Sequence, residues 1–287
     1  MPTRYTTLIS ASELQQCSDV FIVDCSHDLA QPEAGQRDYA AAHIPGALFL
    51  HLDRDLSAPT TGHNGRHPLP DPDAFAARLA HLGLRQDQQV VAYDRAGGGF
   101  AVRLWWMLRW LGHDAVAVLD GGWQAWKAAG GASDSATPEP RAPGNFRRGP
   151  SLAAEVPAIG VMDNLRTGKH LVLDARAPER YAGEVEPLDP VAGHIPGAKN
   201  RFFQTNLQAD GTFKSRERLR EEFTALLEDW DPRDVIHHCG SGVSGCHNLL
   251  AMTHAGMDGS LLYPGSWSEW CANPEHPVAT GREKDKH

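Results

Sequence analysis

Short apolar runs alternate along the chain with segments in which apolar residues recur at helical spacing. FIVD (21–24), VVAY (90–93) and AVAVL (115–119) are apolar almost throughout, and AVRLWWMLRWLG (101–112) has the helical pattern. Strands that are apolar on both faces and separated by helices are typical of a buried, mostly parallel sheet. The pattern therefore predicts an α/β fold, with helices on both faces of a mostly parallel sheet.

The second half of the chain repeats the first, segment by segment and in the same order. The matching pairs are FIVDCS (21–26) with LVLDAR (171–176), AHIPGA (42–47) with GHIPGA (193–198), VVAYDRAGG (90–98) with VIHHCGSGV (235–243), and LDGGWQAW (119–126) with YPGSWSEW (263–270). The offset of about 145–150 residues is too long for a solenoid repeat, so each copy is a domain. We predict an N-terminal domain at 1–135, a Gly- and Pro-rich exposed linker at 136–151, and a C-terminal domain at 152–287.

Composition narrows the choice of partners and compartment. A length of 287 residues favours two domains, and 41% hydrophobic with 22% charged residues is usual for a globular protein. The net charge of −9, with no strongly basic run, argues against a nucleic-acid partner. No apolar run is long enough to span a membrane, and the N-terminus lacks the pattern of a signal or transit peptide. With only five cysteines, we expect a cytoplasmic protein without a disulfide framework.

The stretch HHCGSGVSGCHN (237–248) carries the candidate chemistry, and three interpretations compete for it. Its Gly-x-Gly-x-x-Gly spacing is that of a dinucleotide-binding turn, but no acidic residue ends the next strand. A phosphatase-like loop would need an arginine six positions after Cys239, where this chain has Gly245. A nucleophilic Cys239 fits better, because backbone N–H groups and a following helix N-terminus would stabilise a thiolate. An inert buried cysteine is the alternative when the residue is considered alone.

With its duplicated HIPGA turns, CGSGVSG in the second copy and Asp94 at the matching place in the first, the chain resembles the two-domain rhodanese family of sulfurtransferases. The resemblance covers roughly residues 5–280. The Cys-Gly-Ser-Gly-Val loop is most similar to that of 3-mercaptopyruvate sulfurtransferases, whereas thiosulfate-preferring members more often carry cations after the cysteine. The resemblance implies two tandem rhodanese-like domains, of which the first is catalytically silent.

The resemblance also implies a reaction. Cys239 would take sulfur from a small anionic donor, 3-mercaptopyruvate, release pyruvate and hold the sulfur as a persulfide. A thiol such as thioredoxin, or cyanide, would then accept the sulfur, with no metal or organic cofactor. Two alternatives remain open: a thiosulfate:cyanide sulfurtransferase, and a sulfur-relay or redox-binding module that processes no small substrate.

Individual roles follow from the resemblance, residue by residue. Cys239 is the nucleophile, and Ser241 would form a relay with His67 and Asp53 of the first half, where His51 and His63 compete with His67 for the role. Arg180 would bind the substrate carboxylate. The remaining substrate-binding residues would be those of the loop: Gly240, Gly242, Val243 and Ser244.

One position departs from the family pattern. Members with this loop usually carry a second arginine before the GHIPGA turn, where this chain has Leu188. Lys199 and Arg201 are the nearest cations in sequence that could replace it. Elsewhere, we expect His43 and His194 to bond backbone in their turns. Cys246, about two helical turns after Cys239, would face the core or act as a resolving thiol.

Overall fold

The computed structural model describes residues 4–282 and divides into two compact units. Unit 1 consists of Met1–Ala58, Leu69–Ala153 and Leu207–Phe213. Unit 2 consists of Pro59–Pro68, Ala154–Asn206 and Lys214–His287. Within residues 4–282, no helix is both long enough and apolar enough to cross a membrane.

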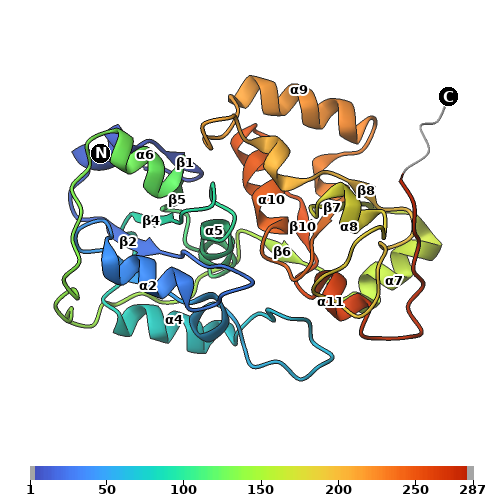
Figure 1. Cartoon of the computed structure of the whole chain (residues 1–287), viewed down its shortest axis with the longest axis horizontal. Coiled ribbons are helices and arrows are strands. Elements are labelled where there is room, and N and C mark those ends of the chain that lie inside the picture. The colour runs from blue at the N-terminus through green and yellow to red at the C-terminus, as the bar shows by residue number, and fades with distance from the viewer. Residues whose placement is uncertain (1–3, 283–287) are drawn as a thin grey trace. The chain divides into compact units, whose positions relative to one another are not determined.

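Unit 1 is built on a five-stranded parallel sheet with the order β1-β5-β4-β2-β3 (Figure 1). Its strands are β1 (Leu8–Ile9), β2 (Phe21–Asp24), β3 (Leu48–Phe49), β4 (Val90–Tyr93) and β5 (Val116–Leu119). Its helices are α1 (Ala11–Gln16), α2 (Ala34–Ala41), α3 (Leu52–Asp55), α4 (Pro72–His81), α5 (Ala101–Trp110) and α6 (Gly122–Ala128).

Unit 2 repeats this plan, with a parallel sheet in the order β6-β10-β9-β7-β8. Its strands are β6 (Ala154–Glu155), β7 (Leu171–Asp174), β8 (Lys199–Asn200), β9 (Val235–His238) and β10 (Leu261–Leu262). Its helices are α7 (Ala158–Thr167), α8 (Pro178–Tyr181), α9 (Arg216–Leu227), α10 (Gly245–His254) and α11 (Ser266–Trp270), with 3₁₀ turns at Phe203–Asn206 and Pro232–Asp234. The predicted α/β class and the tandem duplication are confirmed.

Burial explains why the central strands carry so few polar residues. Every residue of β4, β5, β7 and β9 is buried, so both faces of each sheet are covered. In β4 the alternate residues Val91 and Tyr93 belong to one core cluster with Trp126 of α6. In β9, Ile236 joins a cluster with Trp267 and Trp270 of α11. The helices therefore cover the sheets as the apolar pattern predicts.

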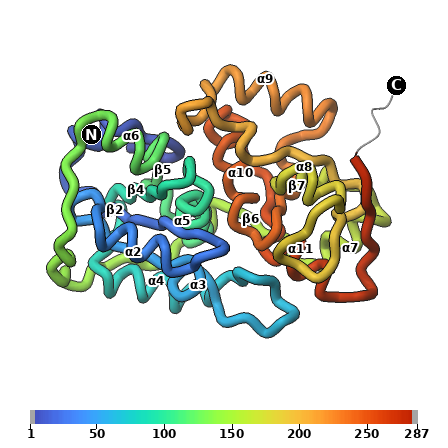
Figure 2. The backbone as a smooth tube through the Cα atoms, viewed as in Figure 1, coloured from blue at the N-terminus to red at the C-terminus, as the bar shows by residue number. Residues whose placement is uncertain are grey.

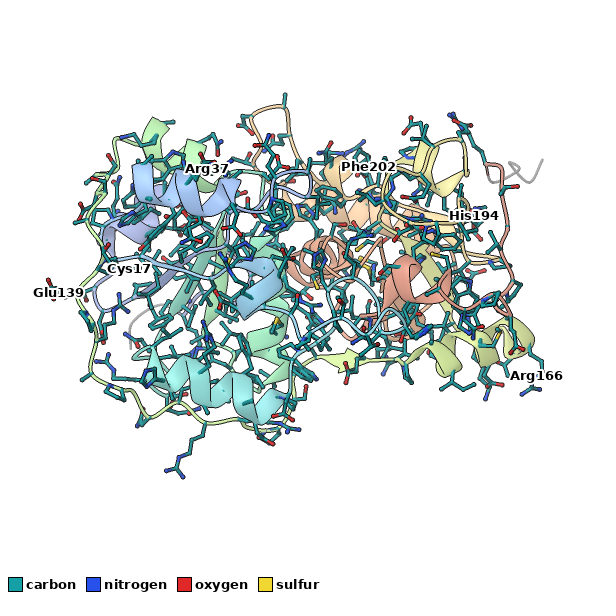
Figure 3. The ribbon with its side chains drawn as sticks, turned by 60° about the horizontal axis from the view of Figure 1, so that its bottom comes forward. Cys17, Arg37, Glu139, Arg166, His194 and Phe202 are labelled. Atoms are coloured by element: carbon teal, nitrogen blue, oxygen red, sulfur yellow. The ribbon has the colours of Figure 1, made fainter. Side chains whose placement is uncertain are left out.

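The two HIPGA turns have the same construction in both units. His43 Nδ1 lies 2.8 Å from the Tyr39 carbonyl oxygen, and His194 Nδ1 (labelled in Figure 3) lies 2.8 Å from that of Tyr181. Each imidazole also stacks on the ring of the same tyrosine, with centroids 4.0 and 3.9 Å apart. The expectation that these histidines bond backbone is confirmed.

The segment expected to be a linker, 136–151, belongs to unit 1 instead. Arg141 donates to the Gly46 carbonyl, and the Gly144 N–H donates to the Ala80 carbonyl, each over 2.7 Å. The Phe146 ring is buried and packs edge-on against His113. A composition rich in Gly and Pro thus produces an irregular segment here, but a few anchors fix it to the unit.

Two short segments belong to a different unit from the residues that flank them in the sequence. Pro59–Pro68, an extended loop between α3 and α4 in Figure 2, belongs to unit 2. Its Arg66 N–H donates to Ser268 Oγ over 2.9 Å. Leu207–Phe213 belongs to unit 1, where the Phe213 N–H donates to the Asp120 carboxylate over 2.8 Å. The first of these segments matters for the site, because it contains His67.

Candidate active site

Cys239 follows directly after β9, at the carboxyl end of a central strand. The strand ends at His238, and the Cys239 side chain is buried, with the residue only 2% exposed. Its backbone is fixed from both sides: its N–H donates to Ser266 Oγ over 3.1 Å, and its carbonyl accepts the Trp267 N–H over 3.0 Å. Carboxyl ends of parallel strands are where α/β proteins place reactive groups.

The glycines after Cys239 are needed for close packing of backbone. Gly242 has φ +76°, and a β-carbon there would lie 2.1 Å from the Pro264 carbonyl oxygen. A β-carbon on Gly245, where α10 begins, would lie 3.2 Å from the backbone of His238. These contacts account for the second and third glycines of the Gly-x-Gly-x-x-Gly spacing without a pyrophosphate.

The loop turns a backbone donor toward the sulfur. The Ser241 N–H points at Cys239 Sγ over 3.4 Å, and α10 begins a few residues further on. Val243 is buried and Ser244 is half-buried at the start of that helix. A thiolate or a persulfide at this place would be stabilised by N–H dipoles rather than by a side-chain cation in the loop.

The structure brings two predicted residues together, although they lie 174 positions apart in sequence. His67 Nδ1 and Ser241 Oγ form a hydrogen bond of 2.7 Å, and both side chains are buried. Both residues belong to unit 2, because His67 lies in the 59–68 segment. The pair therefore offers a group that can exchange protons, and its serine lies two positions after Cys239 in the sequence.

Asp53, the third expected member of the relay, lies in unit 1 near the start of α3. Its N–H donates to His51 Nδ1 over 3.1 Å, and its carboxylate lies 3.9 Å from the same nitrogen. His51 is the N-cap of α3, and His27, His51 and Asp53 offer atoms within 4.8 Å of one another. The role of Asp53 in a relay stays a prediction.

His63, the other competitor, lies on a different part of unit 2. It lines a hollow of about 440 Å³ with residues of α7 and of the segment after α11. Its N–H donates to Thr61 Oγ1 over 3.4 Å. His67, not His63, therefore has the contact with the loop serine.

Arg180, on the short helix α8, lies beside the loop as expected. Its guanidinium donates to Glu186 over 2.6 Å and to Asp189 over 3.3 Å. The position that a β-carbon would occupy on Gly240 lies 3.5 and 3.6 Å from its two Nη atoms. Arg180 can thus reach an anion bound over the loop.

A second guanidinium, which the sequence did not predict, lies beside Gly240 as well. Arg66 Nη2 is 3.1 Å from that β-carbon position on Gly240, and Arg66 Nη1 donates to Asp189 over 2.7 Å. Its one signal in the sequence is that it directly precedes His67. No local pattern shows that a residue this far from Cys239 along the chain lies beside it.

The cations considered as substitutes for an arginine at 188 are occupied elsewhere. Lys199 pairs with Glu228 at 2.9 Å, and Arg201 pairs with Glu222 at 2.7 Å. Leu188 itself is 40% exposed. Neither Lys199 nor Arg201 is therefore placed to replace the missing arginine.

A buried ionic network supports the base of the site. Arg176 binds Asp174 at 2.7 Å and Glu186 at 3.3 Å, and its guanidinium lies 4.7 Å from the Trp267 ring centroid. Burial opposes the charge on Asp174, yet the neighbouring His238 and Arg176 lower its pKa to about 2. Asp174 is therefore ionised at neutral pH and holds Arg176 in place.

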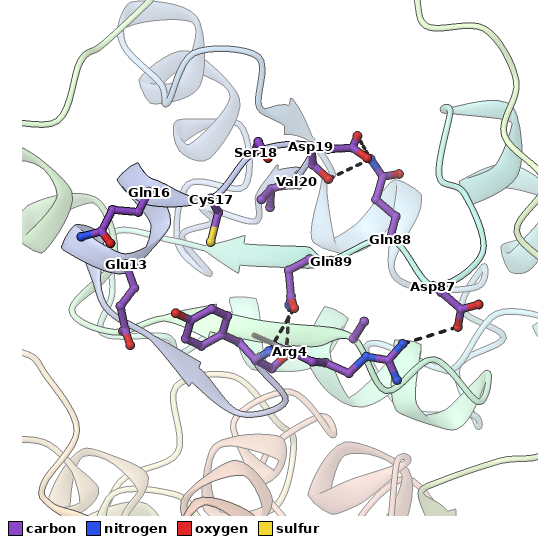
Figure 4. A pocket seen from close by; sticks show the side chains of 12 residues that line it. Arg4, Glu13, Gln16, Cys17, Ser18, Asp19, Val20, Asp87, Gln88 and Gln89 are labelled. Carbon is purple, nitrogen blue, oxygen red and sulfur yellow. Dashed lines mark hydrogen bonds and ion pairs between the residues drawn. The ribbon is translucent and has the colours of Figure 1, made fainter. Parts of the chain in front are cut away.

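Cys17, Cys25 and Cys271 lie in surroundings that favour the neutral thiol. Burial raises the pKa of Cys25 and of Cys271, the latter to about 11. Cys17 lines a pocket of about 780 Å³ on unit 1 (Figure 4), where burial and then Glu13 raise its pKa. Cys246 is buried, and its Sγ–H donates to the Gly242 carbonyl over 3.5 Å. The Cys246 side chain thus contacts the backbone of the loop that follows Cys239.

Known proteins share this architecture and these segments. The family model for a rhodanese-like domain matches residues 7–129 and again 160–273. A Pseudomonas aeruginosa protein named as a probable 3-mercaptopyruvate sulfurtransferase is 49% identical over 265 residues, which cover 92% of this chain and 93% of its own. A mouse thiosulfate sulfurtransferase is 34% identical over 272 residues, or 91% and 89% of the two chains. The crystal structure of SseA from Escherichia coli, described as a 3-mercaptopyruvate sulfotransferase, superposes with a TM-score of 0.78 at 29% identity over 91% of this chain and 98% of that one.

Proposed function

Because the chain belongs to the rhodanese family, we propose that it transfers sulfur from 3-mercaptopyruvate to a thiol or to cyanide through a persulfide on Cys239. The observation that carries the proposal is the loop after β9. There a buried cysteine receives a backbone N–H on its sulfur, next to a serine bonded to a histidine. Both relatives described above are named for sulfur transfer, one from each donor class.

In the first step the Cys239 thiolate attacks the sulfur of 3-mercaptopyruvate. An S–S bond forms, the C–S bond breaks, and its electron pair leaves on carbon as the enolate of pyruvate. Protonation of the enolate gives pyruvate, and we assign the delivery of this proton to the Ser241–His67 pair. Cys239 is left as a persulfide, stabilised by the loop N–H groups.

In the second step an acceptor thiolate attacks the outer sulfur of the persulfide. A new S–S bond forms on the acceptor, and Cys239 leaves as a thiolate, ready for another donor. Cyanide would react in the same way to give thiocyanate. Splitting the transfer into two displacements is the usual advantage of covalent catalysis.

The alternatives fit the site less well. A thiosulfate-specific enzyme would benefit from cations directly after the cysteine, where this chain has Gly240 and Ser241. A relay module that only passes sulfur between proteins would not need a proton donor. The 2.7 Å contact between His67 and Ser241 favours an enzyme that processes a small donor.

We also propose a cytoplasmic location and a thiol such as thioredoxin as acceptor. The location is supported by the cysteines, none of which forms a disulfide, since reduced thiols suit a reducing compartment. The acceptor is supported by its chemistry, because a thiolate is the nucleophile that the second step requires.

The test is a side-by-side assay with 3-mercaptopyruvate and thiosulfate as donors, on wild type and Cys239→Ser. We expect pyruvate release from 3-mercaptopyruvate at a kcat/KM at least about tenfold above that for thiosulfate. Cys239→Ser should lower turnover about a thousandfold or more, as loss of a covalent nucleophile does. Cys246→Ser is the matched control and should retain most activity. If wild type processes neither donor, the proposal fails.

A further inference from the structure

Two guanidinium groups converge over the loop that carries Cys239. The β-carbon position on Gly240 lies 3.1 Å from Arg66 Nη2 and 3.5 Å from Arg180 Nη1. Both side chains reach solvent, with 27% of Arg66 and 18% of Arg180 exposed. An anion that enters beside the cysteine would therefore meet both groups.

Arg66 is held to the protein through one of its guanidinium nitrogens. Asp189 accepts from Nη1 over 2.7 Å, while the buried Nε has no hydrogen-bond partner among the residues that the structure describes. Asp189 also binds Arg180 at 3.3 Å, so a single carboxylate holds the two guanidiniums side by side. A pair of forks in this arrangement suits a planar carboxylate.

Charge balance shows why a second cation is needed. Beside Cys239 the connected network contains Arg66, Arg176 and Arg180 together with three carboxylates: Asp174, Glu186 and Asp189. The three positive and three negative charges cancel. Without Arg66 this network would carry a net negative charge before a thiolate and an anionic donor are added.

We propose that Arg66 binds the carboxylate of the sulfur donor together with Arg180, and so supplies the cation that is missing at Leu188. The identity of the donor rests on the proposed function, but the recognition of a carboxylate beside Cys239 does not. Arg66 reaches the loop from the 59–68 segment, a different part of unit 2 from the segment that carries Leu188. The same segment positions His67, so donor binding and proton transfer share one element.

The test compares alkylation of Cys239 by iodoacetate, which carries a carboxylate, with alkylation by the neutral iodoacetamide. The rate at Cys239 is followed by mass spectrometry in wild type, Arg66→Met and Arg66→Lys. We expect Arg66→Met to lower the iodoacetate-to-iodoacetamide rate ratio about tenfold, the scale of one charged hydrogen bond. Arg66→Lys should give an intermediate ratio. Arg233→Met, which removes an exposed arginine paired with Asp231, is the control and should leave the ratio unchanged.

Steady-state kinetics with 3-mercaptopyruvate give the second arm. Arg66→Met should raise KM about tenfold and change kcat less than about threefold. An alkylation ratio that Arg66→Met leaves unchanged would overturn the inference. The absence of any reaction of Cys239 with either reagent would also overturn it. A fall in kcat with an unchanged KM would also overturn it, because Arg66 would then only position His67. Failure of wild type to process 3-mercaptopyruvate would instead defeat the proposed function and leave the alkylation result to decide on Arg66.

Discussion

The ends of β4 and β9 are equivalent places in the two units, and they differ in the group that occupies the loop. In unit 1 the Asp94 carboxylate accepts four backbone N–H groups over 2.8–2.9 Å, from Ala96, Gly98, Phe100 and Ala101. In unit 2 Cys239 stands at the matching place and receives the Ser241 N–H. The loop of unit 1 is therefore an anion cradle, and the proposed function gives the equivalent loop of unit 2 the same role for a sulfur anion. Unit 1 fills the cradle permanently with its own carboxylate, whereas unit 2 leaves it to a sulfur that can change its chemistry.

A second difference lies one strand away, at the ends of β2 and β7. Asp24 and Asp174 are equivalent and fully buried. Burial raises the pKa of Asp24, which has Ser26 as its neighbour. Asp174 has Arg176 at the matching position, and its pKa is lowered to about 2 in spite of burial. His238 and the Arg176 guanidinium thus turn a buried carboxyl into a fixed negative charge, and this charge anchors Arg176.

The largest effect should come from moving the proposed nucleophile to the equivalent position of unit 1. In Asp94→Cys combined with Cys239→Ser, we expect sulfur transfer at least about a thousandfold below wild type. The loop of unit 1 has Ala96 where unit 2 has Ser241, so it lacks the proton donor. The measurement is pyruvate release from 3-mercaptopyruvate. Activity within about tenfold of wild type would mean that an N–H cradle around a thiol is sufficient.

A smaller effect is expected from making unit 2 resemble unit 1 at the buried aspartate. Arg176→Ser removes the partner of two buried carboxylates, Asp174 and Glu186, and should lower the free energy of unfolding of unit 2 by about 3–5 kcal/mol. Hydrogen exchange of β7 in increasing urea measures this loss. Ser26→Ala is the matched change in unit 1 and should cost less than about 1 kcal/mol. Equal effects of the two substitutions would refute the distinction between the units.

The smallest effect is the change in the folding stability of the two units as the pH falls. Burial lowers the pKa of His237 to about 3 and of His254 to about 4, so the unfolded chain takes up these protons first, near pH 6.5. Unit 2 should therefore lose stability as the pH falls below about 6.5. In unit 1 His113 acts in the same direction, but the raised pKa values of Asp24 and Asp120 bring protons to the folded state and oppose it at lower pH.

Hydrogen exchange at pH 7 and pH 5, corrected for the intrinsic rates, tests this difference. We expect β9 to lose about 1–2 kcal/mol of protection and β4 to lose less. The same loss in both strands, or a greater loss in β4, would contradict the assignment of acid sensitivity to unit 2.

What the sequence predicts well is what depends on local pattern. Apolar runs mark the buried strands, and the duplicated HIPGA turns mark equivalent positions, because burial and turn geometry act over a few residues. The contact of His67 with Ser241 came only from a resemblance, since 174 residues separate the two. Arg66 was missed because its link to Asp189 spans 123 residues and leaves no local signature.

The linker prediction shows a different limit. The Gly and Pro content of 136–151 describes how the unfolded segment behaves, but it does not reveal where single anchors attach. Phe146, Arg141 and Gly144 are among the anchors that fix the segment to unit 1. A segment without regular structure is not thereby a free connection between units.

The central claim is that the loop after β9 holds transferred sulfur on Cys239. It is tested most directly by mixing the protein with 3-mercaptopyruvate in the absence of any acceptor, then measuring pyruvate and mapping added mass by peptide mass spectrometry. We predict one pyruvate per chain and one additional sulfur atom, located on Cys239 and removed by cyanide. Pyruvate release with no sulfur on Cys239, or sulfur found on another cysteine instead, would contradict the account.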